Sequence, residues 1–289
     1  MAAILINGKL QPPEHACIPV YDHGFLYGDG VFEGLRFYNG RILKKAAHLD
    51  RLQDSAQALR LEVPYSRTAI EGWLSELIDA SETENGYIRL IVTRGSGPLG
   101  IDPAQCSKGN LVMIADRLSM VSQSIRTAGA TLIITSNRRY AADQLDARIK
   151  SLNYLNQIMA RLEANDAKAD EALVLNQQGN VAEGSADNVF IIKNQQLITP
   201  PTTDGALDGI TRGMLIELAK KQGIDVSIQS IAPYDIFTAD ECFLTGTGAE
   251  LIPVRQVAGR LIKSCPGEVY KKLEIAFQEA LTCDEYFND

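Results

Sequence analysis

The 289-residue chain lacks the features that mark membrane, secreted and metal-binding proteins. No apolar run approaches the roughly 20 residues that a membrane helix needs. The N-terminus has neither the basic flank nor the apolar length of a signal peptide. Only three histidines are present, and the five cysteines are too scattered for a zinc site. We therefore expect no metal, no membrane contact and, from the odd cysteine count, reduced thiols in the cytoplasm.

The chain also lacks an excess of basic residues, with 28 Lys and Arg against 36 Asp and Glu and a net charge of −8. Nucleic-acid-binding proteins normally present a basic patch, so we expect no nucleic-acid partner. An anionic small-molecule ligand is not excluded, because one site can be locally positive on an acidic protein. The 45% hydrophobic content is typical of a globular protein, and the length suggests one large domain or two ordinary ones.

Hydrophobic periodicity predicts a mixture of strands and helices along the whole chain. Apolar runs between turn residues predict strands within 3–10, 87–93, 111–115, 130–136, 172–175, 181–192, 197–199 and 242–245. Helical spacing predicts helices at 49–61, 66–80, 151–167, 211–222 and 269–281. The face predicted to be buried on helix 151–167 comprises Leu152, Leu155, Ile158, Met159 and Leu162.

Hairpin-like pairs outnumber strictly alternating strands and helices, which indicates an α+β or mixed α/β fold in two domains. Residues 119–129 are polar and turn-rich, and we interpret them as a linker. The predicted domains are therefore 1–118 and 130–289.

Two glycine-rich segments are candidate anion sites. Gly209-Ile-Thr-Arg-Gly213 lies where a helix is predicted to begin, and Thr245-Gly-Thr-Gly-Ala-Glu250 follows a predicted strand. Backbone N–H groups at helix starts and tight turns bind phosphate, and glycine lets the backbone approach it. Neither segment is a P-loop or a dinucleotide fingerprint, and an ordinary cap or turn is the commoner use of each.

Two charged residues interrupt otherwise apolar segments. Lys150 lies beside Ile149 and Leu152, so a core-packed position would lower the pKa of its amine and suit it to Schiff-base chemistry. Glu183 breaks a strand-like run next to Gly184, where a bulge could aim it into a cleft. For both residues the alternative is an ordinary solvated side chain.

A third segment, 22–34, packs four glycines among aromatic and charged residues. It is too rich in glycine for a helix, and we expect a loop that lines a pocket and then enters a strand. A purely structural turn is the alternative.

Seven blocks in order resemble the class IV, or fold type IV, pyridoxal-phosphate-dependent aminotransferases, most closely the branched-chain amino acid aminotransferases. The blocks are Tyr27-Gly-Asp-Gly-Val-Phe-Glu-Gly-Leu-Arg36, His48-Leu-Asp-Arg-Leu52, Tyr87-Ile-Arg89, Ile149-Lys-Ser-Leu-Asn-Tyr154, Val181-Ala-Glu-Gly-Ser185, Leu207-Asp-Gly-Ile-Thr-Arg212 and Leu244-Thr-Gly-Thr-Gly-Ala-Glu250. The resemblance implies a two-domain fold like that of D-amino acid aminotransferase, a homodimer or higher homo-oligomer, and transfer between L-branched-chain amino acids and 2-oxoglutarate.

The resemblance also implies residue roles. Lys150 would bind the aldehyde of pyridoxal 5′-phosphate (PLP) and then move the substrate Cα proton, while Glu183 would keep the ring nitrogen protonated. Tyr154 would contact the ring oxygen. The phosphate would be held by Arg51, Ile210, Thr211 and Thr247.

The substrate residues implied by the resemblance come from both predicted domains. Tyr87 and Gly248 would hold the α-carboxylate, and Tyr27 and Phe32 would form apolar walls. Arg89 and Arg36 would bind the second carboxylate of 2-oxoglutarate. The family's usual Thr-Ala-Ala-Glu turn reads Thr247-Gly-Ala-Glu250 here, and its glycine loosens the carboxylate site.

Two other classes of function remain open. The first is a related PLP enzyme, namely an aminodeoxychorismate lyase or a D-amino acid or (R)-amine aminotransferase. The arginine–x–histidine pair of D-amino acid aminotransferases is missing from loop 95–102, and Tyr87-Ile-Arg89 favours the branched-chain group. The second is a binding protein without catalysis, which the joint presence of the expected lysine, glutamate, arginine and tyrosine disfavours.

Overall fold

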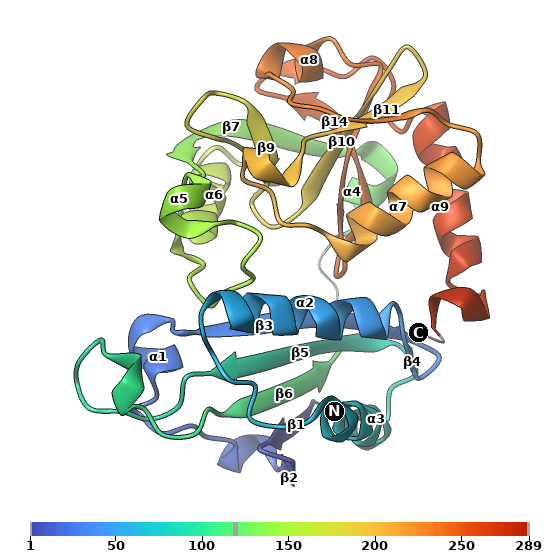
Figure 1. The fold of residues 1–289 in the computed structure, drawn as a ribbon. Coiled ribbons are helices and arrows are strands. Elements are labelled where there is room, and N and C mark those ends of the chain that lie inside the picture. The colour runs from blue at the N-terminus through green and yellow to red at the C-terminus, as the bar shows by residue number, and fades with distance from the viewer. Residues whose placement is uncertain (1, 118–120, 288–289) are drawn as a thin grey trace. The chain divides into compact units, whose positions relative to one another are not determined.

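The computed structural model describes residues 2–117 and 121–287, which divide into two compact units (Figure 1). Unit 1 contains residues 1–118, 149–153 and 283–289, and unit 2 contains 119–148 and 154–282. Residues 118–120, where the first predicted domain ends and the linker begins, lie outside the described residues.

The elements of unit 1 are β1 (Ala3–Ile6), β2 (Lys9–Gln11), α1 (His23–Tyr27), β3 (Gly30–Tyr38), β4 (Arg41–Ile42), α2 (Lys45–Ala58), α3 (Arg67–Ser81), β5 (Gly86–Thr93) and β6 (Leu111–Asp116). Its strands form an antiparallel sheet in the order β2-β1-β6-β5-β3-β4. Core residues such as Leu35, Leu52 and Leu74 place α2 and α3 on one face of this sheet. Because side chains alternate along a strand, the even positions of β3 and the odd positions of β5 point to the other face.

Two short segments join unit 1 although the predicted second domain contains them. Residues 149–153 add to β3, with a bridge between Val31 and Ser151. In the C-terminal segment, the Tyr286 carbonyl accepts from the backbone N–H of Lys44, and Arg41 forms an ion pair of 2.7 Å with Asp284. Hydrogen bonds between residues far apart in the sequence thus set the membership of both segments, which a boundary drawn from composition does not capture.

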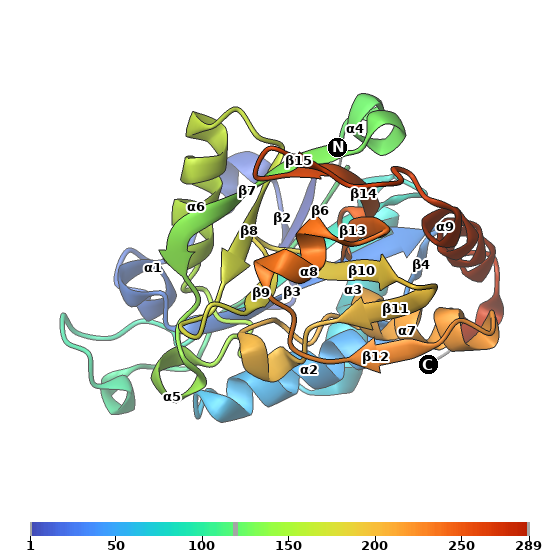
Figure 2. The same cartoon turned by 90° about the horizontal axis from the view of Figure 1, so that it is seen from above.

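The elements of unit 2 are α4 (Gln123–Ala128), β7 (Ala130–Arg138), α5 (Ala142–Leu145), α6 (Leu155–Asp166), β8 (Glu171–Leu175), β9 (Val181–Gly184), β10 (Asn188–Lys193), β11 (Gln196–Thr199), α7 (Ile210–Lys221), β12 (Val226–Ile228), α8 (Pro233–Phe237), β13 (Glu241–Gly246), β14 (Glu250–Val257), β15 (Arg260–Leu261) and α9 (Glu268–Ala280). Its mixed sheet runs β12-β11-β10-β13-β14-β7-β8-β9, and β15 pairs with β14. Figure 2 shows α7 and α9 beside the strands around β13 and α6 beside β7 and β8. No helix in the described part of the chain is long and apolar enough to cross a membrane.

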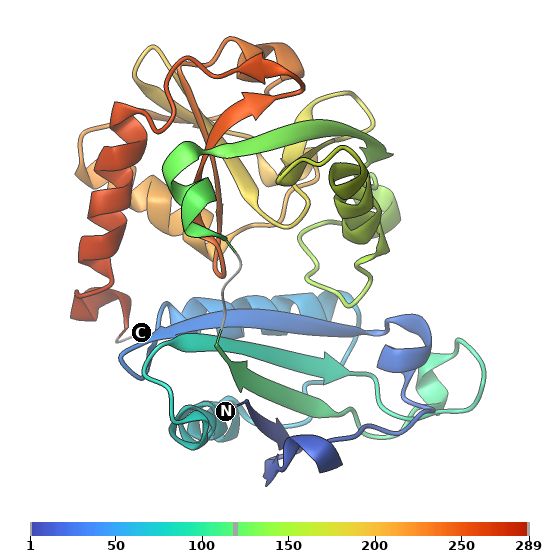
Figure 3. The ribbon, with the colours of Figure 1, turned by 180° about the vertical axis from the view of Figure 1, so that it is seen from behind.

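Two predictions about local structure are wrong, and the segment expected to be a linker contains a helix that was not predicted. The segment expected to be a loop contains α1, because the Asp22 carboxylate caps its N-terminus and Gly28, at φ +70°, ends it. The expected linker contains α4, capped by the Ser122 hydroxyl; Figure 3 shows this green helix leading into β7. The helix expected from residue 151 begins at Leu155, because residues 150–152 pair with β3 instead.

The predicted buried face of that helix is also wrong. Among its members, Leu155, Ile158, Met159 and Leu162 are 72%, 50%, 52% and 48% exposed. The side of α6 that packs on β8 carries Ala160 and Ala164. These small side chains let the helix approach the sheet closely. The larger apolar residues lie on the opposite side of the helix, on the outside of unit 2.

Candidate active site

Lys150 is fixed to unit 1 through its backbone. The Phe32 N–H donates to the Lys150 carbonyl at 2.9 Å, and the Leu152 N–H donates to the Gly30 carbonyl at the same distance. The Lys150 N–H donates to the Ser55 hydroxyl of α2 at 3.1 Å. The amine lies 4.6 Å from the centre of the Phe32 ring. Backbone bonds therefore fix the position of this lysine independently of its amine.

A buried charge cluster links β3 and α2 next to this lysine. The fully buried Glu33 carboxylate accepts from Nε and Nη2 of Arg51 at 2.7 and 2.9 Å, and lies 2.7 Å from Nδ1 of His48. Burial alone would raise the pKa of Glu33, but Arg51 and His48 overcome it and lower the pKa to about 2. Burial also lowers the pKa of His48, although Glu33 opposes this, so a neutral imidazole donates to the carboxylate.

Aromatic and cationic side chains share the face of the unit 1 sheet opposite the core. The Arg89 guanidinium lies 4.4 Å from the Phe32 ring centre and 5.8 Å from that of Tyr87. Arg36 stands directly across the ladder from Tyr87. A Cβ at Gly34 would come within 2.0 Å of the Tyr87 hydroxyl, so the glycine makes room for it. This face can bind an apolar group beside a carboxylate.

Tyr27 differs from the other predicted substrate residues. It lies on α1, is 39% exposed and packs edge-on against His23 with ring centres 4.9 Å apart. Within unit 1 the structure brings together Phe32, Arg36, Tyr87 and Arg89, whereas Tyr27 makes a separate contact.

Glu183 is held in unit 2 by donors to both of its carboxylate oxygens. Nη2 of Arg139 donates to its Oε1 at 2.9 Å, and the Leu207 N–H donates to its Oε2 at 3.0 Å. The same Nη2 atom also donates to the carbonyls of Gly184 and Ser185. A register shift in the β8–β9 pairing falls beside Glu183, which confirms the predicted bulge. The site thus holds a buried carboxylate with a fixed orientation.

The two predicted anion segments lie at one end of unit 2. Helix α7 begins at Ile210 after Gly209, and the N–H groups of its first turn have no partner within the helix. A Cβ at Gly209 would come within 1.9 Å of the Asn188 amide oxygen. Asn188 pairs across the ladder with Thr245, which leads into the second turn. The buried Thr245 hydroxyl has no hydrogen-bond partner among the described residues.

Arg126 holds the backbone around the turn after β13 through two hydrogen bonds. Arg126 of α4 donates to the carbonyls of Ala249 and Leu251 at 3.1 and 3.3 Å. Thr247 and Gly248 of this turn are partly exposed, while Thr211 in the first turn of α7 is buried. Asn188 thus joins the start of α7 to the strand that leads into this turn, and a helix start and a tight turn are both suited to bind a phosphate or carboxylate.

The predicted site residues fall into two groups, each held within one unit. Unit 1 carries Tyr27, Phe32, Arg36, Arg51, Tyr87, Arg89 and Lys150, and unit 2 carries Tyr154, Glu183, Ile210, Thr211, Thr247 and Gly248. Tyr154 is half-buried at the residue before α6.

Sequence reasoning gave no role to the residues that support these groups. The missed residues are Glu33, His48, Arg139, Asn156 and Asn188. The one sequence signal is that His48 and Arg51 are three apart on a predicted helix and so share a face. Arg139 and Asn188 contact partners far away in the chain, and no local pattern identifies them.

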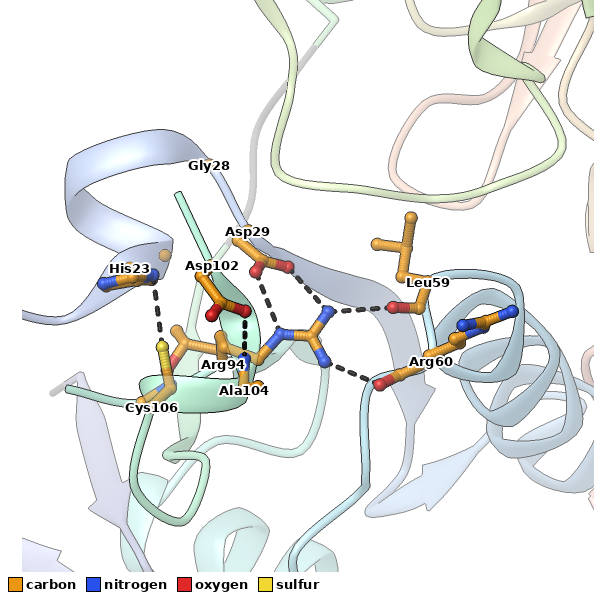
Figure 4. A network of polar contacts seen from close by, with 12 residues as sticks. His23, Gly28, Asp29, Leu59, Arg60, Arg94, Asp102, Ala104 and Cys106 are labelled. Atoms are coloured by element: carbon orange, nitrogen blue, oxygen red, sulfur yellow. Dashed lines mark hydrogen bonds and ion pairs between the residues drawn. The ribbon is translucent and has the colours of Figure 1, made fainter. Parts of the chain in front are cut away.

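A second polar cluster in unit 1 resembles a cysteine–histidine pair (Figure 4). Nδ1 of His23 lies 3.2 Å from the Cys106 sulfur, and Nε2 lies 3.0 Å from the Pro98 carbonyl. In a neutral imidazole that donates from Nε2 to this carbonyl, Nδ1 accepts from the thiol. Burial, reinforced by Asp29, raises the pKa of the Cys106 thiol, whereas a nucleophilic cysteine needs a low pKa.

The rest of this cluster is structural. Arg94 forms a two-pronged ion pair with Asp29 at 2.9 and 3.0 Å, and donates to the carbonyls of Leu59 and Arg60 (Figure 4). These bonds tie the end of β5 to the end of α2. The cluster anchors the loop after β5 and does not form a second reactive centre.

Comparison with known proteins gives matches along nearly the whole chain. Residues 30–257 match the family model described as amino-transferase class IV. A Methanocaldococcus jannaschii protein, named as a candidate branched-chain-amino-acid aminotransferase, is 42% identical over 96% of each chain. The branched-chain-amino-acid aminotransferase of Pseudomonas aeruginosa is 34% identical over 95% of this chain and 91% of its own. The D-alanine aminotransferase of Bacillus licheniformis is 31% identical over 96% of each chain.

A solved structure agrees with these relatives. The T.th. branched-chain amino acid aminotransferase, complexed with N-(5′-phosphopyridoxyl)-L-glutamate, has a TM-score of 0.92 and 33% identity. The match covers 98% of this chain and 96% of that one.

Proposed function

The chain belongs to the class IV aminotransferases, and we propose that it exchanges amino groups between L-branched-chain amino acids and 2-oxoglutarate. The family match and the near-complete structural match confirm the family, the type IV fold and the enzyme class expected from the sequence. The products are branched 2-oxo acids and L-glutamate. The observation that carries the substrate assignment is the match, over nearly all of this chain, to a branched-chain enzyme holding a phosphopyridoxyl-glutamate molecule.

The cofactor is PLP, and the residues present fit it. Unit 2 offers a buried Thr245 hydroxyl without a partner among the described residues, and a carboxylate fixed by Arg139. It also offers the start of α7, whose first N–H groups have no partner within the helix. Ile210, Thr211 and Thr247 would hold the phosphate with Arg51, and Tyr154 would contact the ring oxygen. When bound, PLP supplies a ring that withdraws electrons from the substrate Cα.

The chain's own residues carry the proton transfers. Lys150 would hold the cofactor aldehyde and would then move the proton at the substrate Cα. Glu183 holds a proton at the ring nitrogen, which it can do because Arg139 and the Leu207 N–H stabilise it as a carboxylate. Glu33 acts through Arg51, because the two hydrogen bonds between them fix the orientation of the guanidinium.

The substrate side chain is recognised in unit 1. Phe32 and Tyr27 supply apolar surface for leucine, isoleucine or valine, and Tyr87 binds the α-carboxylate. Arg89, close to both Phe32 and Tyr87, binds the second carboxylate of 2-oxoglutarate together with Arg36. In an apolar pocket, one methylene group more or less on the substrate changes the binding free energy by only about 1–3 kcal/mol. Several branched substrates should therefore compete.

A panel of half-reactions tests this function. The purified protein is loaded with PLP, and absorbance is followed after addition of L-leucine, L-isoleucine, L-valine, L-glutamate, D-alanine or D-glutamate. We expect fast conversion with the L-branched amino acids and L-glutamate, and a rate at least about 100-fold lower with either D-amino acid. Product analysis of L-leucine plus 2-oxoglutarate should show L-glutamate, and its absence would refute the assignment.

The second candidate is a D-amino acid aminotransferase, which the Bacillus licheniformis relative favours. The same panel decides between the two, because a D-specific enzyme would convert D-alanine and leave L-leucine unchanged. Release of an aromatic amine and pyruvate from aminodeoxychorismate would instead indicate the lyase alternative.

We propose that the active form is a homodimer with apolar surface of α6 in its interface. Four large apolar residues lie about half exposed or more along this helix at helical spacing. Replacing Ile158 with glutamate puts an unpaired charge into such an interface, and we expect a dimer Kd about 100-fold higher by light scattering. Asn165→Glu, on an exposed polar position of the same helix, is the control; equal dimer stability in both variants would contradict the proposal.

We also propose that the enzyme works in the cytoplasm. All five cysteines are free thiols in the structure, and two of them are exposed, which suits a reducing compartment.

A further inference from the structure

Arg139 makes more buried polar contacts than any role assigned so far requires. It is 2% exposed, and its guanidinium bridges two elements of unit 2. Nη2 donates to Glu183 of β9 and to the carbonyls of Gly184 and Ser185, all within 3.0 Å. Nη1 donates to the side-chain oxygen of Asn156 at 2.7 Å.

The second element reached by Arg139 is the start of α6. Asn156 is the second residue of that helix, and Tyr154 immediately precedes the helix. The Asn156 amide nitrogen donates to the Arg138 carbonyl at 2.9 Å and to Asn137 at 3.2 Å, and the Asn137 amide donates back to the Asn156 carbonyl. One guanidinium therefore fixes both the Glu183 carboxylate and the backbone that presents Tyr154.

Charge gives Arg139 a second effect. Glu183 is 5% exposed, and an isolated carboxylate at such burial favours the neutral form. The Arg139 guanidinium forms an ion pair of 2.9 Å with Glu183, which favours the ionised form instead. A neutral Glu183 could not hold a proton at a ring nitrogen, because it would no longer attract the resulting positive charge.

We propose that Arg139 is a positioning residue that keeps Glu183 ionised and aligned and holds Tyr154 in register with it. The proposal rests on the proposed function, because Glu183 and Tyr154 would contact different parts of the PLP ring. Arg139 itself acts only through these two residues.

The experiment compares Arg139→Gln, Arg139→Lys, Glu183→Gln and the double variant Arg139→Gln with Glu183→Gln. Three quantities are measured for each: the Kd of PLP for the apoprotein, the pH dependence of the absorbance of bound PLP without substrate, and the single-turnover rate with L-leucine. We expect Arg139→Gln to slow the half-reaction roughly 100-fold, as when one pre-organised electrostatic partner is removed. Its spectral pH profile should shift toward that of Glu183→Gln.

The double variant separates positioning from general structure. If Arg139 acts through Glu183, the double variant should be no slower than Glu183→Gln alone, because the two effects are not additive. Lysine keeps the positive charge but lacks the several N–H donors of a guanidinium. Arg139→Lys should therefore be faster than Arg139→Gln but slower than the unmodified protein. Arg138→Gln is the matched control, since this neighbouring guanidinium donates to backbone carbonyls of β7. It should leave the PLP spectrum and the half-reaction rate unchanged.

Two results would overturn the proposal: a wild-type spectral profile and rate in Arg139→Gln, or a double variant slower by the product of the two single effects. If Arg139→Gln does not fold, the same comparison is made with Arg139→Lys alone and combined with Glu183→Gln. Failure of the proposed function looks different, because the unmodified protein would then bind no PLP or transfer no amino group.

Discussion

Replacing Lys150 with alanine is expected to slow the half-reaction with L-leucine by roughly 10³- to 10⁴-fold, the usual contribution of a positioned acid–base group. The backbone of residue 150 makes the structural bonds, to Phe32 and to the Ser55 hydroxyl, and alanine keeps both. The fold of unit 1 should therefore persist while the amine is lost. Single-turnover absorbance measures the rate, and circular dichroism measures the fold.

A covalent readout strengthens this test. Borohydride treatment of the PLP-loaded protein should leave a phosphopyridoxyl group on the peptide containing Lys150, and the alanine variant should carry none. Lys108→Ala is the control, because this exposed lysine lies over the Tyr65 ring away from the proposed chemistry. A Lys150→Ala protein within about tenfold of the normal rate would remove Lys150 from the mechanism.

Local signals in the sequence predicted part of the fold correctly. Asn7 and Gly8 have the positive φ angles of a tight hairpin turn, and β1 and β2 flank them as the pattern indicated. Helix α7 begins beside Gly209, and the β8–β9 pairing shifts beside Glu183. These features depend on one or two residues and their immediate neighbours, so a single sequence contains the information.

Periodicity alone failed for α6. A stripe of large apolar residues shows that a helix has two different faces, but it does not show what covers either face. In α6 the alanines Ala160 and Ala164 contact the sheet, while Ile158 and Met159 lie exposed. If a second copy covers that stripe, as we propose, the pattern reports the assembly and not the core of one chain.

Sequence patterns singled out Lys150, Glu183 and the two glycine-rich turns as candidates, and the family motif supplied their expected roles. The motif contains Lys150 and Glu183, but their settings depend on partners distant in sequence. Arg139 lies 44 residues from Glu183, and His48 lies 15 from Glu33. Buried polar groups need such partners, yet no spacing rule identifies them, because the tertiary fold brings them together.

Glu33 gives the largest expected effect on stability. Glu33→Gln removes the charge that faces Arg51 and His48 in a buried cluster, and breaking a buried ion pair typically costs about 3–5 kcal/mol. Trp73 is the single tryptophan of the chain and lies on α3, against the core of the same unit. Its fluorescence during urea unfolding therefore reports the free energy of unfolding of the unit that contains Glu33.

The effect of Glu33 should depend on pH in a defined window. Its pKa falls from an ordinary 4.5 to about 2 in the folded protein, so the carboxylate adds about 3 kcal/mol when ionised in both states. That contribution is complete above pH 4.5 and is lost as the pH falls toward 2. His48 also makes the folded protein less stable as the pH falls. Its pKa is lowered in the folded state, so below about pH 6.5 the unfolded chain takes up a proton at this residue before the folded protein does.

Unfolding curves from pH 7 to pH 3 distinguish these contributions. At pH 7 we expect Glu33→Gln to be less stable than the unmodified protein by about 3 kcal/mol, and the gap should narrow below about pH 4.5. Glu14→Gln, at an exposed position, should stay within about 0.5 kcal/mol of the unmodified protein throughout. A gap that stays constant with pH would mean that lost packing, and not the Glu33 charge, explains the destabilisation. The slope below pH 6.5 that belongs to His48 should persist in the variant, because its pKa is lowered first by burial, which the substitution leaves in place.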